Sequence, residues 1–236
     1  MKTFGISLAA RCCAAFCCVL SVCISACSCS LKNEDKAGGD LIKAARQEYC
    51  GLDSAKVIMT NENTGEAEQT FTFKYDEKDV LMFSYYGKSE NSEYAQYNNG
   101  TECFTYDNGE YIHSVRGDDD FVRYTRAVTH PQADEGLLIY EPKYIVSDSS
   151  ETDDSGIEHI THVYDAEKIG AEVEHGDVTD FCVDYYFDPD GSLLYFVETT
   201  TADEDGEEVT YPYKVEITER NSVKDVENTT EPFRDK

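Results

Sequence analysis

Apolar and polar residues alternate along most of the chain, which is the pattern of β-strands with one buried face. In 70–75, 181–187 and 211–217 the aromatic and aliphatic residues fall on one side of the alternation. Short sequences rich in Asn, Asp and Gly separate such segments, and these residues favour the tight turns of hairpins. The pattern therefore predicts an antiparallel sheet of about ten strands.

Shorter segments complete the predicted sheet: 55–59, 80–86, 94–97, 101–106, 111–115, 121–126, 144–146, 157–164 and 193–199. Two of them, 80–86 and 193–199, carry apolar residues on both faces, so both sides of each strand need shelter. Three stretches interrupt the strands. We predict a loop with a short helical turn at 127–142, an exposed acidic loop at 147–156 and a helical turn at 165–170.

The segment 40–50 has helical rather than alternating periodicity. Its apolar residues recur three and four positions apart, Asp40 suits the N-cap, and Gly51 suits the position after the last helical residue. A helix of this length is not stable alone in water. We therefore expect it to cover one face of the sheet.

The first 26 residues have the pattern of an export signal. Lys2 and Arg11 supply positive charge, and no acidic residue precedes Glu34. The apolar run 12–24 is shorter than the roughly 20 residues that span a membrane as a helix. An uncleaved membrane anchor and a plain secretory signal are the alternatives.

The sequence Ile24-Ser25-Ala26-Cys27 resembles the lipobox of bacterial lipoprotein signal peptides. The resemblance implies that Cys27 begins the mature chain and carries a diacylglyceryl lipid, with Cys29 as a second candidate. Two acyl chains anchor a protein stably, so the implied location is the extracytoplasmic face of a bacterial cell membrane. The organisation that follows is a signal peptide, a flexible tether, one β-rich domain and a loose tail, at 1–26, 27–39, 40–228 and 229–236.

The charge of the chain is strongly acidic. Removal of Lys2 and Arg11 with the signal takes the formal net charge from −28 to −30. Binding to nucleic acid needs clustered Lys and Arg, so we predict no nucleic-acid partner. Contact with anionic lipid headgroups is disfavoured as well. A basic protein or cell-wall partner is compatible with this charge, although we interpret acidic runs such as 118–120 and 203–205 as solvated turns.

Seven of the ten cysteines lie at or before Cys29, which leaves Cys50, Cys103 and Cys182 in the domain. An odd and low number excludes a disulfide framework, whereas an extracytoplasmic location permits a single bridge. Cys103 and Cys182 both lie on the less apolar face of their predicted strands. We predict Cys103–Cys182 as the pair to test first, with two reduced thiols as the alternative.

The sequence contains no constellation that indicates catalysis. It has no nucleophile elbow, no phosphate-binding loop and no dinucleotide fingerprint. His159 and His162 have opposite parity on one predicted strand, so a shared metal would need a bulge or a helix there. The acidic turns at 188–191 and 203–208 are interpreted as hairpin corners rather than calcium loops. We therefore predict no enzyme, no catalytic residue, no metal and no cofactor.

The order of the predicted elements resembles the LolA/LppX-like superfamily of lipoprotein and lipid carriers. The likeness covers roughly 40–228: the opening helix, the following strands, the irregular crossover at 127–142 and the closing meander from 181 to 217. It implies an α+β, mainly β fold. A single strongly curved antiparallel sheet would form a half-barrel, with the N-terminal helix and short helices on its concave side. The sequence contains no invariant motif of the family, so no functional residue transfers from the resemblance.

The resemblance implies an apolar cavity that binds a lipid or another apolar small molecule. The chain is rich in aromatic residues, with 17 Tyr and 11 Phe. Nine aromatic residues are the predicted lining of the concave face: Phe71, Phe73, Phe83, Tyr85, Phe104, Tyr106, Phe181, Tyr185 and Tyr195. The alternative is an acidic, surface-exposed interaction module that binds a protein or cell-wall partner and has no ligand cavity.

Overall fold

The computed structural model describes residues 36–89, 91–119, 121–125, 138, 140–173 and 175–234. Eleven strands form one antiparallel sheet in the order β6-β5-β4-β3-β2-β1-β11-β10-β9-β8-β7. The strands are β1 Ser54–Asn61, β2 Glu66–Tyr75, β3 Leu81–Lys88, β4 Glu93–Asn98, β5 Glu102–Asp107, β6 Glu110–Val115, β7 Ile145–Thr152, β8 Glu158–Tyr164, β9 Asp177–Phe187, β10 Leu193–Glu204 and β11 Glu207–Thr218.

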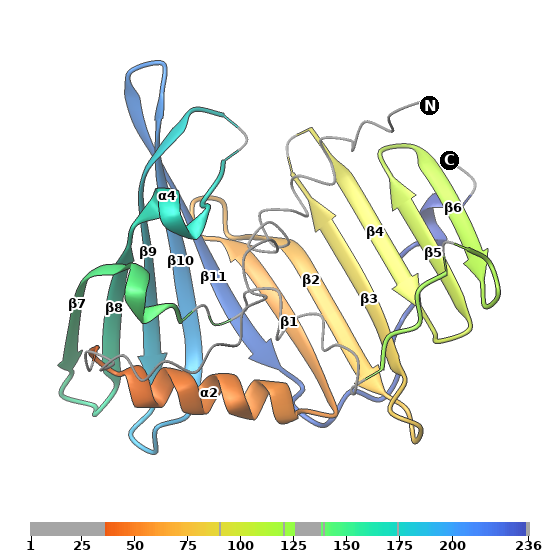
Figure 1. The fold of residues 1–236 in the computed structure, drawn as a ribbon, viewed down its shortest axis with the longest axis horizontal. Helices are drawn as coiled ribbons and strands as arrows, with labels where there is room; N and C mark the ends of the chain where they lie inside the picture. The colour runs from red at the N-terminus through yellow and green to blue at the C-terminus, as the bar shows by residue number, and fades with distance from the viewer. Residues whose placement is uncertain are drawn as a thin grey trace.

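The chain builds this sheet from two meanders that meet in its middle. Strands β1 to β6 run outward to one edge, and the chain then crosses at 116–144 to β7 at the opposite edge. Strands β7 to β11 return from there until β11 pairs with β1. The edges β6 and β7 do not pair, so the sheet stays open (Figure 1). The predicted fold class, a mainly β chain with one antiparallel sheet and few helices, is confirmed.

Within the part of the chain that the structure describes, four helical segments accompany the sheet: α2 Gly39–Gly51, η1 Pro142–Tyr144, α4 Ala166–Ile169 and η2 Glu231–Phe233. Helix α2 is the predicted amphipathic helix, and it lies across one face of the sheet (Figure 1). Its stripe of Ile42, Ala45 and Tyr49 is buried, which is the burial that a short helix needs for stability. The face that α2 covers is called the helix-side face, and the opposite one the outer face.

The main core lies on the helix-side face. In the half near β1, Phe73 stands between Ala55 and Phe83 in adjacent strands. In the other half, Tyr185 stands between Phe196 and Ile160. These six side chains are at most 5% exposed, so one apolar layer extends from β8 to β3.

Two predicted segments differ in the structure. The expected strand 121–126 is absent from its described part, 121–125, where Thr125 forms an isolated bridge with Val80. The expected loop 147–156 begins instead with β7, which runs to Thr152 and is exposed after its first residue. An edge strand pairs on one side only, and polar residues along it discourage pairing with other chains. Strand β7 therefore needs no apolar pattern.

The C-terminal residues 229–234 are docked, which corrects the expected loose tail; 235–236 lie outside the described residues. Phe233 is 6% exposed and stacks on Tyr106 with 4.1 Å between ring centroids. The Thr229 hydroxyl donates to the Tyr85 carbonyl at 3.0 Å. The outer face of this half carries its own apolar group around Ala95, and the tail supplies the residue that covers it.

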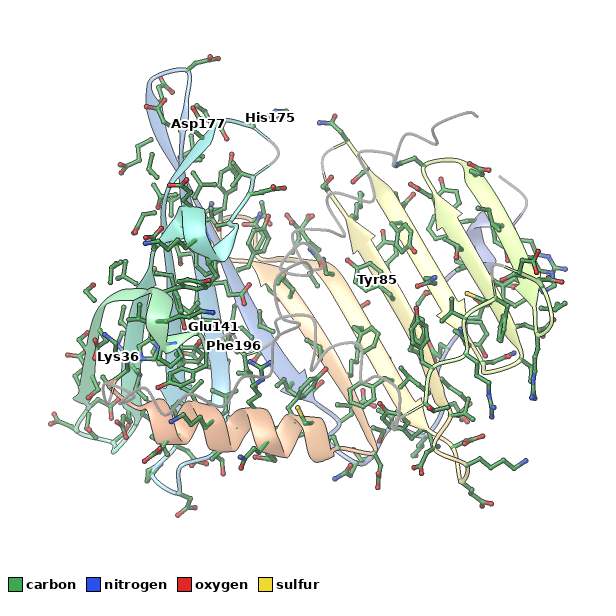
Figure 2. All side chains as sticks on the ribbon, viewed as in Figure 1. Lys36, Tyr85, Glu141, His175, Asp177 and Phe196 are labelled. Atoms are coloured by element: carbon green, nitrogen blue, oxygen red, sulfur yellow. The ribbon has the colours of Figure 1, made fainter. Side chains whose placement is uncertain are left out.

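The N-terminal residues 36–39 are docked as well, which shortens the expected flexible tether; 27–35 lie outside the described residues. The Ala37 N–H donates to Asp148 Oδ2 at 2.9 Å, and the Ala37 carbonyl lies 2.7 Å from Nε2 of His162. Asp148 and His162 face each other across β7 and β8. Lys36 adds an ion pair to Asp148 at 3.6 Å, beside the start of α2 (Figure 2). We call residues 36–38 the entry segment.

The predicted Cys103–Cys182 disulfide is wrong. No disulfide joins Cys103 to Cys182. Six strands lie between β5, which holds Cys103, and β9, which holds Cys182. Adjacent strands are about 4.8 Å apart, whereas a bridge needs Cα atoms within about 7 Å. Burial raises the pKa of the Cys182 thiol to about 11, which keeps it protonated at neutral pH.

Candidate apolar-ligand site

The sheet places the nine predicted lining residues on two different faces. Six share the helix-side face: Phe71, Phe73, Phe83, Tyr85, Phe181 and Tyr185. The other three point to the outer face, which corrects their assignment: Phe104, Tyr106 and Tyr195. Cys103 of β5 pairs with Asn98 of β4, which pairs with Phe83 of β3, so Cys103 is on the helix-side face. Phe104 and Tyr106 lie one and three residues after Cys103 and therefore point to the outer face. Tyr195 follows an irregularity in β10 between Leu193 and Tyr195, which shifts the parity of the strand.

The six residues of the helix-side face belong to one apolar layer, here called the aromatic floor, in which aliphatic residues of β1 and β11 lie between two groups of aromatic rings. Phe71 lies 5.7 Å from Phe73 and 5.8 Å from Phe83 between ring centroids, and Tyr49 of α2 meets Phe73 edge-on at 5.9 Å. Such pairs are favourable beyond the area they bury. Tyr85 is the partly exposed member, and it lies on β3 in the half that α2 does not reach (Figure 2).

Single residues of the long crossover cover the floor beside α2. Tyr124 packs on Phe83 with ring centroids 5.8 Å apart, and its carbonyl accepts the N–H of Leu81. Leu138 is fully buried in the same core. Tyr140, at the far end of the crossover, packs against this core. In the described residues the cover over this face therefore consists of α2, the short helices η1 and α4, and isolated side chains, rather than a second sheet.

A small hollow lies between α2 and the sheet. It has no room for a water-sized molecule, and its lining comes from Ala45, Glu48, Tyr49, Leu52, Leu193, Ile217 and Arg220. Arg220 Nη1 pairs with Glu48 Oε1 at 2.8 Å at this hollow. Small-molecule pockets usually measure about 300–1,000 Å³. A larger apolar molecule over the floor would therefore require α2 or the crossover to shift.

A polar group interrupts the floor at Glu198. This residue lies on the helix-side face of β10, between Val183 of β9 and Tyr213 of β11. Burial raises the pKa of its carboxyl to about 7. The neighbouring Tyr185 hydroxyl donates to that of Tyr164, and burial raises the pKa of both phenols. Glu198 did not stand out in the sequence, although its position two residues after the apolar Phe196 was a usable signal.

His162 is a further buried titratable group on this face. It is 0% exposed, and its Nδ1 atom has no hydrogen-bond partner among the described residues. Burial lowers its pKa, so the ring is neutral at pH 7 and Nε2 is the protonated nitrogen that donates to Ala37. His159 points to the outer face, where Nε2 lies 2.8 Å from Asp184. The described residues contain no group of three or more metal-ligating side chains.

The described residues form an open antiparallel sheet whose apolar face is covered by α2, by the short helices η1 and α4 and by single residues of the crossover. Within the described residues, no helix has the length and apolar character to cross a membrane. The expected signal, lipobox and Cys27 lie outside the residues that the structure describes.

No protein family model matches the chain, and no curated protein matches it. Among solved structures the chain is similar to LprF from Mycobacterium bovis, with a TM-score of 0.46 and 12% identity over 81% of this chain and 96% of that one. It is also similar to the lipoprotein LppX of Mycobacterium tuberculosis, with a TM-score of 0.33 and 15% identity over 81% and 98%. At these scores neither residues nor activities carry over to this chain.

Proposed function

We propose that this protein is a lipid-anchored extracytoplasmic lipoprotein that holds a lipid or another apolar ligand against its helix-side face. The observation that carries the proposal is the aromatic floor, which continues over neighbouring strands under a thin cover. An apolar face closed by a few helices and single side chains can accept an acyl chain when the cover shifts, because the ligand then replaces the contacts that the cover loses.

Native mass spectrometry of the mature chain tests ligand binding. The sample is residues 27–236 with Cys27→Ser, which removes the lipid while leaving the proposed mature chain otherwise intact. We expect copurified apolar molecules, or uptake from an added lipid extract, because the floor favours apolar surface over water. Phe71→Asp should abolish the uptake by placing a charge in the floor, and Tyr195→Asp on the outer face is the matched control. A bare protein under all loading conditions would contradict the ligand proposal.

Membrane attachment is tested by Cys27→Ala in the full chain. A protein held by two acyl chains partitions stably to membranes, and one without them does not. We expect the variant to move from the membrane fraction to the soluble fraction or to accumulate as the unprocessed precursor. Fractionation with immunodetection measures this, and Cys29→Ala is the matched control. Unchanged membrane association of Cys27→Ala would show that the anchor lies elsewhere.

The second candidate is an acidic interaction module. The observation in its favour is the end of the β10–β11 hairpin, which carries exposed Asp203, Asp205 and Glu207 and extends beyond the neighbouring strands (Figure 1). A basic partner held there should lose affinity steeply as salt rises, because exposed charges are screened over about 10 Å at 0.1 M salt. Salt-sensitive partner capture by a protein whose mass stays bare would favour this candidate over the first.

A further inference from the structure

Glu198 is an acidic residue on a largely apolar face of the sheet. It makes no hydrogen bond or ion pair within the part of the chain that the structure describes. By contrast, Glu216 pairs with Lys214 at 2.9 Å, Glu68 accepts from the Asn61 amide at 2.8 Å, and Glu204 accepts from the Tyr211 hydroxyl. The carboxylate of Glu198 is therefore able to accept hydrogen bonds from a ligand, an ion or water without losing a contact within the described residues.

The surroundings of Glu198 are aromatic and apolar. Val183 and Tyr213 flank it in the neighbouring strands, and Phe196 precedes it on the same face. Glu198 is also close enough to Tyr164 and Tyr185 for its charge to raise the pKa of both phenols. The Tyr164 oxygen accepts one hydrogen bond from Tyr185, which leaves it acceptor capacity.

Charged groups from the covering elements also face this cluster. Arg46 of α2 lowers the pKa of Tyr185, whereas Glu141 and Tyr140 at the end of the crossover act in the opposite direction on Tyr164. Arg46 does not form an ion pair with Glu198. The negative charges of Glu198 and Glu141 therefore favour a positive ligand group beside Tyr164 and Tyr185, whereas the positive charge of Arg46 disfavours it.

We propose that Glu198, together with the phenols of Tyr164 and Tyr185, anchors the protonated amine of an apolar ligand in the floor. A carboxylate and aromatic ring faces are the groups that attract an ammonium in proteins. An anionic headgroup would meet Glu198, Glu141 and a chain of net charge −28. A hydroxyl could accept or donate a hydrogen bond there but would gain no charge interaction. The inference rests on the proposed ligand site and assigns its headgroup chemistry.

Three probes with the same apolar chain test the inference: decylamine, decanol and decanoate, each below its micellar concentration. The protein is the mature chain with Cys27→Ser, and binding is measured by titration calorimetry at pH 8. We expect decylamine to bind about tenfold or more tightly than decanol, because a charge-assisted hydrogen bond in a low-dielectric site is stronger than a neutral one. Decanoate should bind most weakly. At pH 5.5 the preference for the amine should shrink, since Glu198 is then protonated.

The variant Glu198→Gln distinguishes recognition of the ligand's headgroup from binding of its apolar chain. This variant should bind decylamine and decanol within about twofold of each other, while Glu208→Gln at the exposed hairpin end should keep the wild-type preference. If Glu198→Gln retains the preference for the amine, the inference is wrong while the proposed function stands. If no probe binds any of the proteins, the proposed function fails and the inference fails with it.

Discussion

Replacement of Gly38 by alanine should destabilise the domain by about 3 kcal/mol. Gly38 has a φ of 63°, a left-handed conformation in which alanine is strained. A Cβ atom there would lie 2.0 Å from Cδ1 and 2.7 Å from Cγ1 of Ile160, whose side chain is fully buried. Relief of the clash requires either displacement of Ile160 in the core or release of the entry segment from β7 and β8. Urea unfolding of the mature chain measures the loss.

Gly65→Ala is the matched control for this change. Gly65 has a similar φ of 72°, but a Cβ atom there would have no neighbour within 4 Å. Only the backbone strain applies, so the expected loss is about 1 kcal/mol. Equal losses for the two variants would show that the contact between Gly38 and Ile160 contributes nothing beyond backbone conformation.

Glu198→Gln should stabilise the protein at pH 8 by about 2 kcal/mol and change its stability little at pH 4.5. The carboxyl pKa is raised from 4.5 to about 7 by burial. Between pH 4.5 and about 7 the carboxyl of Glu198 is protonated in the folded state and ionised in the unfolded state. The free energy of unfolding of the wild type therefore falls as the pH rises through this range. A shift of this size corresponds to about 3 kcal/mol, which we reduce because the side chain is partly exposed.

Urea unfolding from pH 4.5 to 8 measures this effect for Glu198→Gln and the wild type. The difference between the two free energies of unfolding should grow from pH 4.5 to 7 and stay constant above that. Glu208→Gln should follow the wild-type curve, because Glu208 is exposed at the end of the hairpin. A constant difference across the whole range would show that Glu198 titrates alike in the folded and unfolded states.

Most of the sheet could be predicted from the sequence because its strands obey local rules. Strands β2, β9 and β11 have one apolar face each, and Asn, Asp and Gly mark the turns between strands. Helix α2 could be predicted equally well from its stripe of apolar residues. Strand β7 was not, because an exposed edge strand and a loop have the same polar composition.

The candidate site was predicted only in part because a bulge changes which residues of a strand share a face. An extra residue in β10 between Leu193 and Tyr195 turns Tyr195 to the outer face. The docked ends of the domain were beyond local rules as well. The entry segment is held by Asp148 and His162, and Phe233 by Tyr106, all of which are distant in sequence. Short polar segments of this kind look like linkers until their partners are known.

The junction of the two meanders has a consequence for export. Every ladder except one joins strands that follow each other in the chain, and the exception pairs Lys56 of β1 with Thr218 of β11. Hairpins between successive strands can form as the chain emerges, whereas this ladder must wait for the last strand. Until β11 is available, the edge of β1 presents unpaired backbone groups to other chains. Under the proposed export, this interval falls during translocation, and a chaperone or rapid completion of transport would have to protect β1.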